Sequence, residues 1–215
     1  MFKFKNLIII TLVLLFVGMS TISCKVSIST EDHTDQIQTL SDGRMVFPPD
    51  IAAGDTLLYL KALQKDRDYH IIIDNFGGSA FDTMVIINRI DELQKKGFTI
   101  TTETYGYAMS GGAFIFIMGD RRIIHDGAAI MFHGAGFIGP YGQRQSLRSL
   151  ALTGKTTLKP EQVKSLSIID NKFMKMLTIK IALRDAQITY WMYKFDYNFM
   201  SSDEAMRLGV ATELG

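Results

Sequence analysis

Cysteine is almost absent from this chain of 215 residues, and its one copy, Cys24, lies near the N-terminus. The rest of the sequence holds no thiol, which excludes disulfide bonds within it and catalysis by a thiolate. Charge of one sign is also missing, because 23 basic residues balance 22 acidic ones. Without a basic excess or an arginine-rich segment, the chain is not predicted to bind nucleic acid.

Histidine is scarce as well. His33, His70 and His125 show no metal-ligand spacing with carboxylates, so no metal is expected. Hydrophobic residues make up 47% of the chain and charged residues 21%, which is close to the average for globular proteins. The length suits one domain with a sizeable core.

The first 24 residues differ from the rest. Residues 1–6 carry two lysines, and residues 7–19 form an apolar run followed by small residues, which is typical of a secretory signal. The run is about two-thirds of the ~20 residues that a membrane-spanning helix needs. Cys24 stands where a lipoprotein signal has the residue to be acylated, although Thr21 replaces the usual leucine. We predict a lipid anchor; the alternatives are an ordinary cleaved signal and an uncleaved anchor.

Beyond this signal, the chain divides into a polar tether and one α/β domain. Residues 25–43 lack any apolar pattern, and residues 44–215 alternate apolar runs with segments of helical spacing. Strands are predicted at 44–47, 69–73, 98–104, 123–124 and 129–132, and helices at 52–65, 81–96, 109–118, 160–183, 185–194 and 201–209. Alternating strands and helices imply parallel pairing through crossovers. Residues 137–160 give no clear pattern.

Two glycine-rich turns each follow a predicted strand and precede a helix. They are Gly77-Gly78 and Ser110-Gly111-Gly112. Glycines let backbone N–H groups approach a ligand, so two such turns side by side could form an oxyanion hole. Tight turns with close packing explain most Gly-Gly pairs equally well.

Ser110 and His133 are the candidate reactive residues. A serine at a sharp strand-to-helix turn can act as a nucleophile, but it can equally be an ordinary helix N-cap. His133 follows an apolar strand and precedes small residues, so it faces either a cleft or a structural partner. Spacing alone leaves these alternatives open.

Four motifs occur in order between residues 44 and 212. They are IDNFGGS at 73–79, GYAMSGGA at 106–113, IMFH at 130–133, and FMSSDEA at 199–205 with Gly209. Their order resembles that of the ClpP-type serine peptidases, within the wider ClpP/crotonase fold. The resemblance implies a single domain of repeated β-β-α and βαβ units, wound as a spiral with a parallel sheet.

By this resemblance, Ser110 is the nucleophile, His133 its general base, and the N–H groups of Gly78 and Gly111 form the oxyanion hole. The sequence departs from the family at Phe76, where the family has proline, and this change alters the substrate groove. The family's acid corresponds to Tyr197, so the neighbouring Asp196 is the candidate third member of the triad. The stretch between His133 and the last motif is also longer than usual.

The expected function is hydrolysis of peptides or unfolded segments by a secreted, membrane-tethered serine peptidase. The mechanism needs no cofactor, and the family resemblance implies a homo-oligomeric ring. An extracytoplasmic location excludes a partner that depends on cytoplasmic ATP. One alternative is a non-catalytic binding or scaffold protein that has lost the triad acid. Another is acyl-CoA chemistry of the crotonase type, which does not need a Ser–His pair at these positions.

Overall fold

The structure of the protein is a computed structural model that describes residues 37–139, 143–155, 157–193 and 198–215. These residues belong to one compact unit. The predicted signal, Cys24 and most of the predicted tether lie outside the described residues, as do Asp196 and Tyr197.

The larger sheet has six strands in the order β1-β2-β3-β4-β6-β11. From β2 onward every neighbouring pair is parallel, and β1 runs antiparallel to β2. The parallel pairing predicted from the sequence is therefore confirmed for this sheet. The strands are β1 (Gln38–Thr39), β2 (Met45–Val46), β3 (Tyr69–Ile72), β4 (Ile100–Thr104), β6 (Arg121–Ile124) and β11 (Glu213–Leu214).

Strand β1 lies within the range that the sequence assigns to the tether. It pairs with β2 through a turn in which the N–H of Gly43 donates to the carbonyl of Leu40 at 2.9 Å. Both residues of β1 are exposed, so they carry no apolar pattern from which the pairing can be predicted. The folded part thus begins before residue 44.

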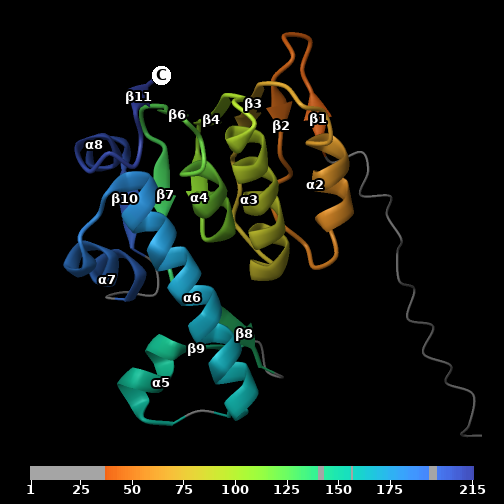
Figure 1. The fold of residues 1–215 in the computed structure, drawn as a ribbon. Coiled ribbons are helices and arrows are strands. Elements are labelled where there is room, and N and C mark those ends of the chain that lie inside the picture. The colour runs from red at the N-terminus through yellow and green to blue at the C-terminus, as the bar shows by residue number, and fades with distance from the viewer. Residues whose placement is uncertain (1–36, 140–142, 156, 194–197) are drawn as a thin grey trace, which may run out of the picture. The chain divides into compact units, whose positions relative to one another are not determined.

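Three helices cover one face of this sheet, as Figure 1 shows. They are α2 (Thr56–Ala62), α3 (Ala80–Lys95) and α4 (Gly111–Phe116). The apolar stripe predicted for α3 is buried, with Ile86, Ile90 and Leu93 fully inaccessible. Thr102 of β4 points toward these helices, because its hydroxyl donates to the carbonyl of Phe116 at 2.7 Å.

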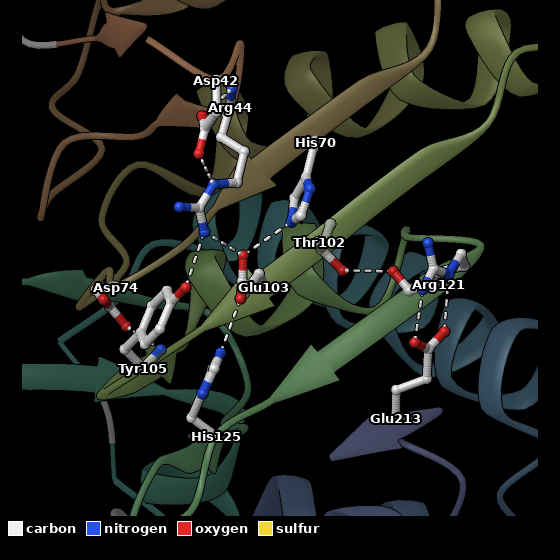
Figure 2. Close-up of polar contacts among 10 residues, drawn as sticks. All are labelled: Asp42, Arg44, His70, Asp74, Thr102, Glu103, Tyr105, Arg121, His125 and Glu213. Atoms are coloured by element: carbon white, nitrogen blue, oxygen red, sulfur yellow. Dashed lines mark hydrogen bonds and ion pairs between the residues drawn. The ribbon is translucent and has the colours of Figure 1, made fainter. Parts of the chain in front are cut away.

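The opposite face of the sheet carries a hydrogen-bonded group of charged and polar residues (Figure 2). Side chains alternate along a strand, so Glu103 points away from the helices. The Nε2 atoms of His70 and His125 each lie 2.8 Å from one of its oxygens, and Arg44 donates to it at 3.1 Å. Burial alone would raise the pKa of Glu103, but hydrogen bonds from His125, Tyr105 and Arg44 outweigh it and hold that pKa below its ordinary value.

A buried arginine joins β6 to the C-terminal segment. The guanidinium of Arg122 donates to the carbonyls of Gly119 at 2.8 Å, Val210 at 2.8 Å and Gly209 at 3.1 Å. The residue is only 8% exposed, and burial lowers the pKa of its guanidinium. Each of these hydrogen bonds ends on a backbone carbonyl, and the nearby carboxylate of Asp120 also stabilises the charge.

The second sheet has three strands in the order β10-β7-β5 and carries the candidate reactive residues. Strand β5 (Tyr107–Met109) runs parallel to β7 (Ala129–Met131), and β10 (Phe199–Ser201) runs antiparallel to it. The sequence predicts no strand at 107–109, whereas Tyr107 begins one. Three residues are too few to produce a readable alternation.

The remaining elements follow β7 along the chain. Strands β8 (Gly136–Ile138) and β9 (Arg144–Ser146) form a hairpin that leads into α5 (Leu147–Thr153), in the region without a sequence prediction. Helices α6 (Pro160–Ile181), α7 (Asp185–Tyr193) and α8 (Ser202–Arg207) lie where helices are predicted. Among the described residues, no helix has both the length and the apolar character needed to cross a membrane.

Candidate active site

Ser110 sits at the sharp junction between β5 and α4. Its φ of 51° and ψ of −120° fall in a region that non-glycine residues rarely adopt, at a cost of about 1–3 kcal/mol. Its backbone N–H donates to the carbonyl of Met131 at 2.8 Å, which ties the turn to β7. The residue has the N-cap position of α4, but its side chain makes no capping hydrogen bond. The hydroxyl is therefore not used as a helix cap.

The Gly77-Gly78 turn packs directly against this serine. A Cβ on Gly77, whose φ is 94°, would lie 2.6 Å from the Cβ of Ser110. Gly78 has a φ of 144°, and a Cβ there would lie 2.1 Å from the carbonyl oxygen of Ile51. Both positions require glycine, because no side chain fits and the backbone conformation is strained for other residues.

A half-buried aspartate connects the two glycine-rich turns. Oδ1 of Asp74, two residues after β3, accepts from the hydroxyl of Thr104 and from the N–H groups of Tyr105 and Gly106 at 2.8 to 2.9 Å. Figure 2 shows Asp74 beside Tyr105. These bonds fix the chain that leads into Ser110 relative to the chain that leads into Gly77.

His133 lies two residues after β7, and Nδ1 of its ring has two neighbours, one a hydrogen-bond acceptor and the other a donor. Its Nδ1 lies 2.7 Å from the carbonyl oxygen of Gly134 and 2.7 Å from the guanidinium of Arg144 on β9. Arg144 also donates to the Gly134 carbonyl. A carbonyl can only accept and a guanidinium can only donate, so each favours a different tautomer of the ring. Gly134 favours the tautomer with the proton on Nδ1, in which Nε2 is unprotonated and can act as a base.

Asp170, on α6, is a site residue that the sequence reasoning did not identify. It is 1% exposed and accepts from the N–H of Ala135 at 2.6 Å and from the hydroxyl of Tyr193 at 3.0 Å. Burial raises the pKa of Asp170 above its ordinary value, against the opposing effect of these hydrogen bonds. The sequence does contain a signal for its burial. Leu166, Phe173 and Leu177 are spaced so that they share one face of the helix with Asp170, and this face is buried.

Most of the predicted site residues surround one cavity of about 440 Å³. Ser110, Gly111, Gly78 and His133 line it, together with Arg144. Its apolar walls come from Phe76, Phe114, Ile138 and Phe173, among others. Asp196 and Cys24 lie outside the described residues. Within the described residues, no group of three or more histidine, cysteine or acidic side chains could hold a metal ion.

A serine on a strained strand-to-helix turn, a histidine and two glycine turns around one cavity are the parts of a serine-hydrolase site. The comparison with protein families identifies the class more closely. The model of the Clp protease family, described as Clp protease, matches residues 49–215. The chain belongs to this family, so the resemblance to ClpP-type peptidases is confirmed. No curated protein matches the chain.

Proposed function

We propose that the protein is a serine peptidase in which Ser110 is the nucleophile and His133 the general base. The observation that carries the proposal is the cavity lined by both residues and by Gly78 and Gly111. Oγ of Ser110 attacks the peptide carbonyl carbon while its proton passes to Nε2 of His133. The resulting oxyanion accepts hydrogen bonds from the N–H groups of Gly78 and Gly111.

The remaining steps complete the hydrolysis with the same residues. The tetrahedral intermediate breaks its C–N bond, and the departing amine takes the proton from His133. Water then gives up a proton to His133 and attacks the acyl ester, which releases the acid and restores Ser110. Asp196 is the proposed third member of the triad, and it would hold the tautomer of His133 that the first step requires.

Three further features belong to the same proposal. The protein acts outside the cytoplasm, is anchored through lipidated Cys24, and works without ATP on peptides or unfolded segments that enter unaided. It forms a homo-oligomeric ring, in keeping with its family. Replacement of Cys24 by serine tests the anchor, since it should abolish partitioning of the mature protein into detergent. Persistent partitioning would show that the lipid assignment is wrong.

An activity-based fluorophosphonate probe tests the catalytic assignment. The probe should label the wild-type protein and fail to label Ser110→Ala. Ser201→Ala is the matched control, because Ser201 caps α8 through its hydroxyl and lies outside the cavity lining. Absence of labelling in a correctly folded wild-type protein would overturn the proposal.

The second candidate is a non-catalytic binding or scaffold protein with the same fold. The contact between Arg144 and Nδ1 of His133 favours it, because a donor at Nδ1 leaves the proton on Nε2. A ring in that tautomer cannot take the proton of Ser110. A scaffold would bind peptides without cleaving them, and the fluorophosphonate probe would not label it.

A further inference from the structure

Three aromatic side chains form an exposed row on the surface. Phe76, Tyr107 and Phe199 are 55%, 49% and 47% exposed. The rings of Phe76 and Tyr107 are stacked, with centroids 6.3 Å apart. The rings of Tyr107 and Phe199 meet edge to face, also with centroids 6.3 Å apart. We call these three residues the aromatic row.

The aromatic row comes from the three segments that carry the candidate site. Phe76 directly precedes Gly77-Gly78, and Tyr107 stands at the start of β5, which ends just before Ser110. Phe199 lies on β10 and pairs with Met131 of β7, two residues before His133. Any ligand on the row is therefore held in a defined position relative to the site.

The row is also continuous with the cavity. Phe76 lines the cavity together with Ser110 and His133 and stacks on Tyr107 outside it. Single exposed aromatic residues are common on proteins, but a contiguous set that leads out of a cavity indicates a binding surface.

The spacing of the rings matches an extended polypeptide. Side chains on one face of an extended chain are two residues apart, which corresponds to about 6.6 Å at ~3.3 Å per residue. The two ring separations of 6.3 Å agree with this repeat. An extended chain along the row would bring alternate side chains to successive rings.

We propose that the aromatic row is a specificity-determining subsite that binds large apolar side chains at alternate positions of an extended substrate, next to the bond in the cavity. The inference rests on the proposed peptidase function and adds a sequence preference to it. Unfolded segments expose such side chains, whereas folded proteins bury them. The row would thus select unfolded chains without help from another protein.

The test measures peptide binding in a Ser110→Ala background, so that no cleavage is needed. The probe is a nine-residue fluorescein-labelled peptide with phenylalanine at alternate positions, compared by anisotropy with a peptide that has serine there. Tyr107→Ser and Phe199→Ser should each weaken binding of the phenylalanine peptide about three- to tenfold. They should leave the weaker binding of the serine peptide unchanged.

Leu57→Ser is the matched control, because Leu57 is 78% exposed and lies on α2, outside the cavity lining. It should leave both affinities unchanged. Equal affinities for the two peptides, or an equal loss of affinity in the control, would overturn the proposal. A change in oligomeric mass for Tyr107→Ser in sedimentation would also overturn it, by assigning the row to a contact between copies.

Failure of the row and failure of the proposed function have different signatures. Fluorophosphonate labelling of the wild-type protein, with Ser110 intact, reports on the catalytic residues and does not depend on the peptide measurement. Normal labelling without peptide discrimination would reject the row and leave the peptidase. Peptide discrimination without labelling would support the row on a protein that binds but does not cleave.

Discussion

The carboxylate of Asp170 accepts a hydrogen bond of 2.6 Å from the backbone N–H of Ala135, two residues after His133. A carbon on Gly134 would lie 2.8 Å from the same carboxylate, so α6 is packed tightly against the segment that carries the histidine. The orientation of His133 therefore depends on a helix that contributes no catalytic group of its own.

Replacement of Asp170 by alanine should lower both stability and reactivity. It leaves the buried N–H of Ala135 without its acceptor and the hydroxyl of Tyr193 with only the weak acceptor Sδ of Met174, at a cost of about 1–3 kcal/mol in the free energy of unfolding. The labelling rate of Ser110 should fall, because the backbone next to His133 can shift. Asp170→Asn keeps an acceptor oxygen and should recover much of both. Equal stability of the alanine variant and wild type in urea titrations would contradict this role.

A second prediction concerns the Gly78 turn. Gly78→Ala should destabilise the protein and stop probe labelling, because the added carbon would lie 2.1 Å from the Ile51 carbonyl oxygen. Gly54→Ala is the matched control, since Gly54 also has a positive φ, of 101°, but open space around its Cβ position. We expect Gly78→Ala to be less stable than this control by about 1–3 kcal/mol in thermal or urea unfolding. If the two variants lose similar amounts of unfolding free energy, the effect comes from backbone conformation alone, which contradicts the proposed clash with Ile51.

The strained backbone of Ser110 gives a third prediction. Ser110→Gly should be more stable than Ser110→Ala by about 1 kcal/mol, because glycine adopts a φ of 51° without strain. Both variants lack the hydroxyl, so neither should react with the probe. The difference in unfolding free energy between the two variants isolates the conformational cost. If the alanine variant proves the more stable, the turn is not strained in solution.

The pKa of Glu103 predicts how stability changes in acid. Its folded-state pKa is held below the ordinary value of 4.5, so its carboxylate contributes stability that is fully present above 4.5 and is lost as the pH falls through the lower folded value. Glu103→Gln should flatten the pH dependence of the unfolding free energy on the acid side of 4.5. Glu204→Gln serves as a control at an exposed ion pair with Arg207. An unchanged acid slope in Glu103→Gln would exclude this contribution.

The sequence predicts the central βαβ part of the fold because local pattern and tertiary position agree there. The Tyr69–Ile72 strand is an apolar run, and the 16 residues of α3 repeat their apolar side chains at helical spacing. Strands β1, β8 and β9 escape prediction because they are short and largely polar or glycine-containing, so that pairing with a neighbour decides their structure.

The candidate site divides in the same way. Ser110, His133, Gly78 and Gly111 were predicted from the ordered motifs, and they line one cavity. Asp170 was missed because it acts from α6, far along the chain, and Arg144 because its hairpin lies in the region 137–160 that gives no clear pattern. The catalytic role of Asp196 stays a prediction, since that residue lies outside the described part of the chain.

Arg122 has a consequence for the order in which the protein can fold during synthesis. Two of its three carbonyl acceptors, at Gly209 and Val210, leave the ribosome nearly ninety residues later than the guanidinium they bind. Until those carbonyls are available, the guanidinium of Arg122 must stay hydrated, so this part of β6 cannot be buried. The burial of Arg122 therefore depends on Gly209 and Val210, and a chain cut just after α8 would leave the guanidinium without two of its three carbonyl acceptors.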